Sequence, residues 1–220
     1  MCFSAAASFT AAAIIGGVGA ATLAQKPKAK DLAFAAIPVI FAAHQAIEGA
    51  IWMTLHHGGV PYALIVAYLM IAQVLWPSYI PLSVILMERG RRRPGLWVLL
   101  AAGLFVSGAL ALILVNHRYS VTAISDGLRY ATDHEFEYRL LGLYLIATTA
   151  PLFLSRYRYV VAFGGATLLG AIVTVVAFYF AAASVWCFFS ALASVLVFLH
   201  FRRNRRERPV SESSTNIEAA

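Results

Sequence analysis

The sequence predicts an all-α integral membrane protein, a polytopic bundle of seven transmembrane helices. Composition is the first reason: 61% of the 220 residues are hydrophobic and 12% are charged, against about 45–50% and about 25% in soluble domains. The mean hydropathy of +0.77 agrees. The second reason is that long uncharged runs alternate with short basic clusters. Together these features predict that lipid surrounds most of the chain.

The spans follow from the gaps between charges, because a helix needs about 20 mostly apolar residues to cross the hydrocarbon layer. Residues 159–201 carry no formal charge, which is too long for one span and suits two joined by a tight turn near Ala181–Ser184. The shortest candidate is the fifth. The five spans before this pair are predicted over about Ser4–Ala24, Leu32–His56, Pro61–Met87, Leu96–Val115 and Glu137–Leu154.

The distribution of basic residues predicts the orientation. Fourteen of the 17 lysines and arginines collect on one side when alternate connections are assigned to the cytoplasm, leaving Arg118, Arg129 and Arg139 on the other. Cytoplasmic loops carry the excess of Lys and Arg. We therefore expect an external N-terminus and a cytoplasmic C-terminus, in a multi-pass protein of the cell membrane.

Two stretches are expected outside the bilayer. The connection from Asn116 to Phe136 mixes acidic and basic residues and is long enough to form an external cap. Residues 204–220 are polar and typical of a disordered cytoplasmic tail, which leaves residues 1–203 as the transmembrane domain. The lysines follow the first apolar run instead of preceding it, so that run is expected to remain as a membrane helix. His200 is expected at the membrane interface.

The most informative position is Glu48, the only formally charged residue between Leu32 and Met87. A carboxylate at this depth costs about 2.5–3.5 kcal/mol on insertion scales, so it is expected to face the bundle interior. His44 lies one helical turn before it, and Gln45 and Trp52 share roughly the same face. His44 and Glu48 are thus the candidate catalytic residues.

Further candidate site residues reach the same half of the bundle if the topology is right. The third span brings Gln73 to a similar depth and also contains Trp76, where Pro77 and Pro81 remove helical hydrogen bonds and predict a kink. The opening segment places Cys2 at the external mouth, and the seventh span places Trp186, Cys187 and Ser190 there. Binding of a cofactor or ligand is assigned to Gln45, Trp52, Gln73, Trp76, Trp186 and Ser190.

Several roles are open for these groups. Glu48 and His44 could tie helices together, form a ligand or metal site, or take part in proton or ion conduction. Cys2, His44, Glu48 and Cys187 would make a four-ligand set for zinc or another transition metal. The cysteines could equally form a disulfide in an oxidising compartment, remain inert thiols, or, at Cys2, become the terminal residue once Met1 is removed.

A resemblance supports the same positions. The opening Met1-Cys2-Phe3-Ser4-Ala5, the His44-Gln45-Ala46-Ile47-Glu48-Gly49 run with Trp52, the Trp76-Pro77 pair and the Trp186-Cys187-Phe188-Phe189 segment are similar to a family of uncharacterised bacterial seven-helix membrane proteins. The likeness covers the transmembrane region and excludes the tail. It implies a topology and a set of hallmark positions, but no activity or substrate.

Two functions of different classes are therefore compared. One is a metal-binding protein or a membrane-embedded metal-dependent enzyme; the other is a non-catalytic receptor or sensor for a small lipophilic ligand. Proton or ion conduction ranks third, because the polar residues stop near the midplane. The seventh span lacks a lysine for a retinal Schiff base, and no phosphate-binding glycine loop is present. The net charge of +7 is interpreted as orienting the chain in the lipid bilayer, and nucleic-acid binding is not expected.

Overall fold

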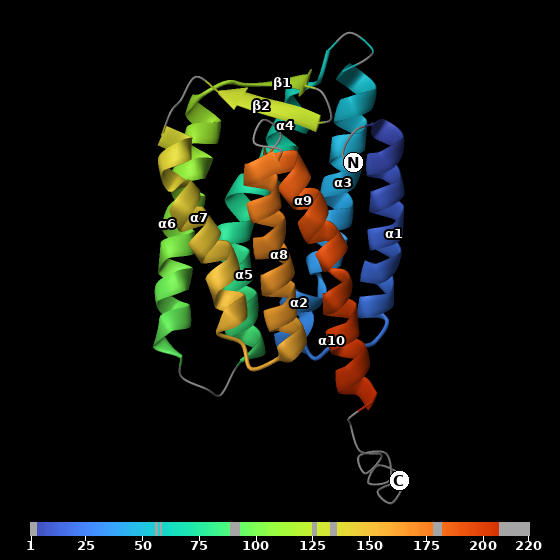
Figure 1. Cartoon of the computed structure of the whole chain (residues 1–220), viewed down its shortest axis with the longest axis vertical. Helices are drawn as coiled ribbons and strands as arrows, with labels where there is room; N and C mark the ends of the chain where they lie inside the picture. The colour runs from blue at the N-terminus through green and yellow to red at the C-terminus, as the bar shows by residue number, and fades with distance from the viewer. Residues whose placement is uncertain are drawn as a thin grey trace, which may run out of the picture.

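The computed structural model describes residues 4–55, 57, 59–88, 93–124, 127–132, 136–177 and 182–206. Helices dominate it and run roughly parallel along the long axis (Figure 1). In chain order the elements are α1 (Ala5–Leu23), η1 (Ala29–Asp31), α2 (Leu32–Ala35), α3 (Ile37–Leu55), α4 (Tyr62–Leu69), η2 (Met70–Leu75), α5 (Trp76–Met87), α6 (Pro94–Asn116), β1 (Tyr119–Ile124), β2 (Gly127–Thr132), α7 (Phe136–Phe153), α8 (Arg158–Ala177), α9 (Ala182–Ala193) and α10 (Val195–Arg206).

Six helical segments among the described residues are long enough and apolar enough to cross a membrane. They match six of the seven predicted spans. The helix at the predicted fifth span, α7, has a shorter apolar stretch, Leu140–Phe153, and packs against α5, α6 and α8. The six segments are Ala5–Leu23, Ala29–Leu55, Tyr62–Met87, Pro94–Asn116, Arg158–Ala177 and Ser184–Arg203.

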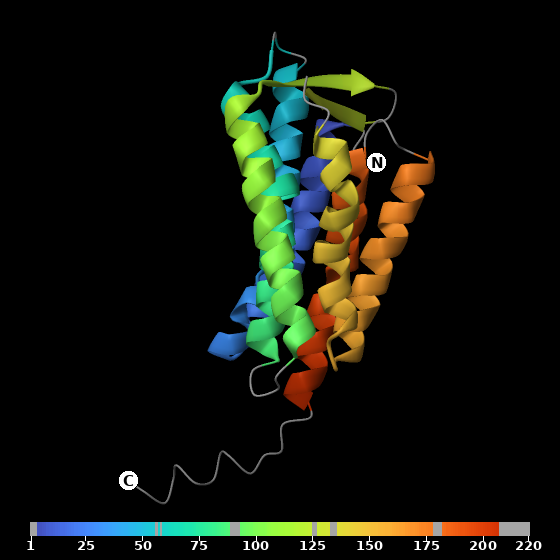
Figure 2. The same cartoon turned by 90° about the vertical axis from the view of Figure 1, so that its left-hand side faces the viewer.

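The prediction of an entirely helical chain needs one correction. The connection after α6 forms a two-stranded antiparallel sheet, with Tyr119 opposite Thr132 and Ile124 opposite Gly127. This hairpin crosses one end of the bundle, while α10 ends at the opposite end (Figures 1 and 2). Tyr119 and Leu128 are buried, so the strands turn apolar side chains toward the helix ends. The charged residues around this amphipathic hairpin obscured the pattern of its strands in the sequence.

The last two helices differ from the predicted boundary. Ser184 was expected in a tight turn, but it lies inside α9. A further break occurs at Ser194, where α9 gives way to α10, and the Ser194 hydroxyl donates to the Ala191 carbonyl at 2.6 Å. Placing Ser184 in the first turn of α9 directs its side chain into the bundle, where it is fully buried.

The segment with the predicted kink contains a π-helical stretch, η2, immediately before Trp76-Pro77. In the wider π register a carbonyl pairs with the N–H five residues later, which for Ala72 is Pro77, and proline has no N–H. The Tyr144 hydroxyl of α7 donates to the Ala72 carbonyl at 2.5 Å. A side chain from a neighbouring helix thus replaces a missing backbone bond.

Pro81 has the same effect one turn later, because it supplies no N–H to the Pro77 carbonyl. That carbonyl lies against Gly103 of α6: a Cβ at residue 103 would sit 1.9 Å from the Pro77 oxygen. Only a residue without a side chain allows this approach of α5 and α6. Proline and glycine together therefore set the spacing of these two helices.

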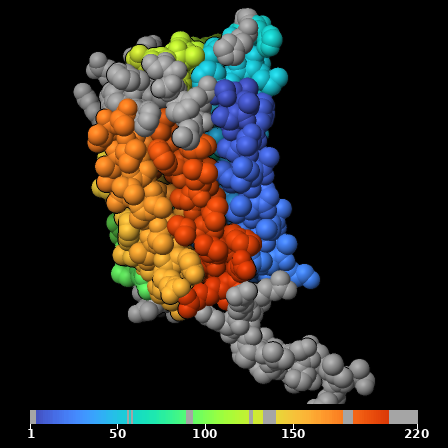
Figure 3. Space-filling model, turned by 45° about the vertical axis from the view of Figure 1, so that its right-hand side comes forward, coloured from blue at the N-terminus to red at the C-terminus, as the bar shows by residue number. Residues whose placement is uncertain are grey.

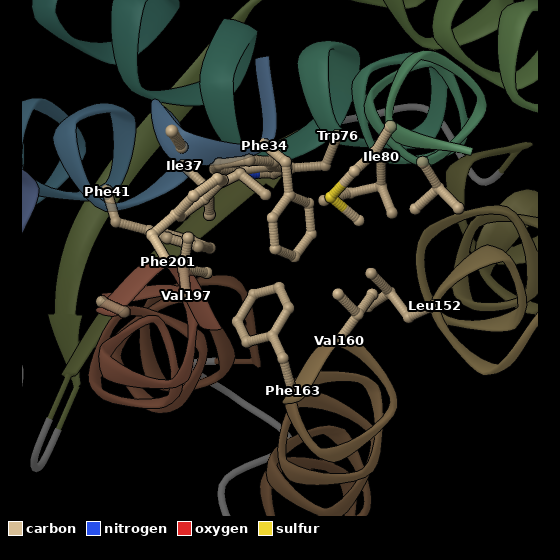
Figure 4. Packing of buried hydrophobic residues seen from close by; sticks show 14 of the residues in the cluster. Phe34, Ile37, Phe41, Trp76, Ile80, Leu152, Val160, Phe163, Val197 and Phe201 are labelled. Atoms are coloured by element: carbon tan, nitrogen blue, oxygen red, sulfur yellow. The ribbon is translucent and has the colours of Figure 1, made fainter. Parts of the chain in front are cut away.

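Two apolar clusters fill the interior. One lies toward the end where α10 finishes and is rich in aromatic and branched side chains from α2, α3, α5, α8 and α10, including Phe34, Phe41, Trp76 and Phe163 (Figure 4). The other lies toward the hairpin. His200, expected at the interface, is instead 3% exposed, with its ring edge-on to Phe34 and Tyr157. Aromatic neighbours from α2, the α7–α8 connection and α10 itself account for this burial.

A carboxylate fastens the connection between α7 and α8. Glu88, at the end of α5, accepts hydrogen bonds from the Ser155 hydroxyl and the Arg156 backbone N–H, each at 3.0 Å. The Arg156 guanidinium lies 3.6 Å from the second carboxylate oxygen. The Tyr157 hydroxyl and this carboxylate raise the pKa of Arg156, so the arginine stays charged.

Candidate functional site

Glu48 lies inside the bundle, as predicted, and is fully buried. Helix α3 places it toward the hairpin end, facing α9. Its carboxylate accepts a hydrogen bond from Gln45 Nε2 at 3.3 Å and another from the Ser184 hydroxyl of α9. The carboxylate is therefore held by two neutral donors, one from its own helix and one from a residue 136 positions later.

His44 is also fully buried, one turn below Glu48. Neither ring nitrogen has a hydrogen-bond partner of normal geometry among the described residues, although the backbone of Tyr68 is a polar neighbour. The ring stacks on Tyr68 of α4, with centroids 4.2 Å apart, and Tyr68 stacks in turn on Tyr130 of β2 at 4.4 Å. This column of three rings connects the buried imidazole to the hairpin.

Cys187 lies one turn after Ser184 on α9 and is buried near Glu48. With Trp76, Trp186 and Ser190 it lines a small cavity between α3, α5, α7, α8 and α9. The space open to the centre of a water molecule is about 30 Å³, room for roughly two waters. The cavity is lined by Phe41, Trp76, Ile80, Tyr144, Thr148, Thr149, Leu152, Phe163, Thr167, Trp186, Cys187 and Ser190.

The structure thus divides the predicted residues into two neighbouring groups. Gln45 and Glu48 are in direct contact, with His44 beside them on α3, whereas Trp76, Trp186 and Ser190 surround the cavity. Cys187 belongs to both groups. Trp52 packs in the hairpin-side apolar cluster, and Gln73 lies half-buried in η2 beside α3. Cys2, Met1 and the tail from residue 207 onward lie outside the described residues.

Three residues contribute to the site that the sequence did not indicate: Ser184, which was predicted to lie at a turn, and the two tyrosines Tyr68 and Tyr130. A serine three residues before Cys187 on a helical face was a detectable signal for Ser184. Nothing in the spacing of Tyr68 and Tyr130 indicates that they stack, because they come from a helix and a strand 62 positions apart in the sequence.

The side chains at this site are of the kinds that coordinate metal ions. A buried carboxylate and an imidazole on one helix face are donors that zinc and similar metals accept, and a thiol lies nearby. Among the described residues, no three His, Cys, Asp or Glu side chains are grouped so that they could hold a metal ion. A metal would therefore need donors beyond that part of the chain.

Comparison with known families adds a classification. A profile described as a family of unknown function, DUF6629, matches residues 1–213. The chain belongs to this family. The match runs through every helix described above and includes Cys2, His44, Glu48 and Cys187. No curated protein and no solved structure matches the chain significantly.

Proposed function

We propose that this protein is a membrane-embedded metal-binding protein whose centre includes His44 and Glu48, completed by donors from outside the described residues, such as the Cys2 thiol. One observation carries the proposal: a fully buried imidazole, which makes no hydrogen bond of normal geometry within the described chain and has the Tyr68 backbone as a polar neighbour, lies one turn from a fully buried carboxylate. Buried polar atoms are normally satisfied, so such an orphan calls for a bound group.

The environment of Glu48 supports this assignment. Metal-ligating carboxylates are usually hydrogen-bonded by surrounding groups that orient them, and removing such groups typically lowers metal affinity about 10–100-fold. Ser184 and Gln45 supply those bonds here. A zinc-like metal with an open coordination position lowers the pKa of bound water, which is the basis of metal-assisted hydrolysis. If the protein is an enzyme, we propose that this centre carries out such a hydrolysis.

We also propose the predicted topology of seven spans with a cytoplasmic C-terminus. The described basic residues of the α1–α2 and α7–α8 connections and of α10 lie at the end where α10 finishes, opposite the hairpin (Figure 1). By the positive-inside rule that end faces the cytoplasm. On this assignment the hairpin and the site beneath it face outward, and α7 serves as a short seventh span.

The test is the metal content of the purified full-length protein, measured by mass spectrometry of the elements. We expect about one zinc-like ion per chain in the wild type, and a loss of at least about tenfold in His44→Ala and Glu48→Gln. Ser184→Ala should weaken retention without abolishing it. The matched control is His57→Ala, because His57 is exposed. Circular dichroism of each variant shows that it is folded. Equal metal content in folded His44→Ala and wild type would refute the proposal.

A receptor for a small lipophilic ligand is the second candidate, favoured by the cavity. Trp76 lines it, and Trp76 Nε1 is a buried donor without a partner among the described residues. Room for only about two waters means that any larger ligand would have to displace side chains. Thermal stabilisation by a panel of lipophilic compounds, with Trp76→Phe as the variant, tests this alternative.

A further inference from the structure

At the end of the bundle away from the hairpin, two arginines from different helices lie close to one tyrosine. Arg158 opens α8 and donates through Nη2 to the Tyr159 hydroxyl at 3.3 Å, with its guanidinium 5.0 Å from the ring centre. Arg203, near the end of α10, lies close to the same hydroxyl. Helices α8 and α10 lie side by side on this face (Figure 3). Two like charges are therefore held together at one point.

Both guanidinium groups remain open to the outside. Arg158 and Arg203 are exposed, as is Arg202 beside them. Within the described residues, Arg158 has no ion pair with a carboxylate, in contrast to Arg156, whose charge is balanced by Glu88. Arg158 therefore contributes a positive charge at the start of α8 that no described carboxylate balances.

The position of this cluster is the edge of an apolar helix bundle. Val160, two residues into α8, is already buried, and both Arg158–Ala177 and Ser184–Arg203 qualify as spans. Arginines at span ends keep their charge at the headgroup level while their stems lie along apolar surface. A tyrosine at the same level is typical of an interfacial anchor. In a membrane, the anion found at this headgroup level is a lipid phosphate.

We propose that Arg158 and Arg203, held by Tyr159, form a binding site for the phosphate headgroup of an anionic phospholipid. Planar guanidinium groups bind phosphate oxygens in pairs, and two of them converging from neighbouring helices would clamp one headgroup. The bound lipid would hold the ends of α8 and α10 together. On the topology proposed above, this site faces the cytoplasmic leaflet, where anionic lipids attract basic segments.

The experiment measures thermal unfolding of the full-length protein in neutral detergent while phosphatidylglycerol is titrated in. Phosphatidylglycerol should raise the unfolding temperature of the wild type, with phosphatidylcholine as the neutral comparison. Each arginine near an anionic surface contributes a factor of about five in affinity, so Arg158→Gln/Arg203→Gln should bind roughly 30-fold more weakly. Because detergent presents lipid to both ends of the protein, the result does not depend on orientation or on metal binding.

Arg118→Gln is the matched control. Arg118 lies over the Tyr62 ring at 4.8 Å, the same arrangement at the hairpin end, and should keep the full wild-type response. Arg158→Lys/Arg203→Lys retains charge but not the paired geometry and should show an intermediate loss. An unchanged response in the double glutamine variant, or no response in the wild type, would overturn the proposal. An equal response to inorganic phosphate would do so too, by assigning the site to a soluble anion.

Discussion

Replacing Gly103 with alanine tests the proline-dependent packing of α5 and α6. The new Cβ would lie 1.9 Å from the Pro77 oxygen and 2.7 Å from its carbonyl carbon. Carbon–oxygen contacts begin at about 3.3 Å, so the helices would have to separate locally by roughly 1.4 Å. The obstacle is backbone, which cannot rotate away as a side chain could. The strain must therefore spread along both helices.

The loss of stability caused by Gly103→Ala can be estimated. Overpacking of this kind costs about 1–3 kcal/mol, and the rigid obstacle places Gly103→Ala at the upper end. Alanine regains about 1 kcal/mol of helix propensity. The net loss of about 2 kcal/mol should lower the unfolding temperature by about 4–8 °C for a chain of this length.

Gly108→Ala is the matched control on the same helix. A Cβ at residue 108 meets nothing within 4 Å, so only the propensity gain remains. This variant should be as stable as the wild type or up to about 1 kcal/mol more stable. Thermal unfolding of both variants in the same detergent measures the difference. Similar unfolding temperatures for the two variants would refute the close approach of α5 and α6.

Three further substitutions examine the polar contacts. Ser184→Ala removes a donor from the Glu48 carboxylate and should lower stability by about 1.5–3 kcal/mol, whereas Ser83→Ala, whose hydroxyl bonds its own helix, should cost less than about 1 kcal/mol in thermal unfolding. Tyr144→Phe leaves the Ala72 carbonyl without its donor, so we expect a loss of about 1–2 kcal/mol in the same assay; wild-type stability would contradict the role given to that bond. Glu88→Ala should expose the α7–α8 connection to cleavage by added protease, which unchanged digestion would disprove.

The sequence predicted the helices well because charge gaps and hydropathy are local signals. The predicted first span, Ser4–Ala24, matches α1 to within one residue at each end, and Ser4 is the N-cap, accepting from the Ala7 N–H at 3.2 Å. The hairpin was missed for a physical reason. Its strands are short, and their burial depends on the helix ends that they cover.

The site could be predicted only in part from the sequence. The burial of Glu48 follows from the cost of a charge in lipid, so one residue and one principle were enough. Its partner Ser184 lies 136 positions away, and the pairing depends on how α3 and α9 are rotated against each other. Hydropathy places a helix in the membrane but does not specify which face meets a given neighbour. Contacts between distant helices therefore had to come from the structure.

The hydroxyl groups below the site bear on whether Glu48 could belong to a conduction path. Thr148, Thr149 and Thr167 line the cavity, but each donates to a carbonyl of its own helix, at 2.8, 2.6 and 3.0 Å. A hydroxyl that donates its proton to a backbone carbonyl cannot relay a proton without breaking that hydrogen bond. Beyond them lies the apolar cluster around Phe34 and Phe163 (Figure 4). The arrangement favours a closed binding centre over a route across the membrane.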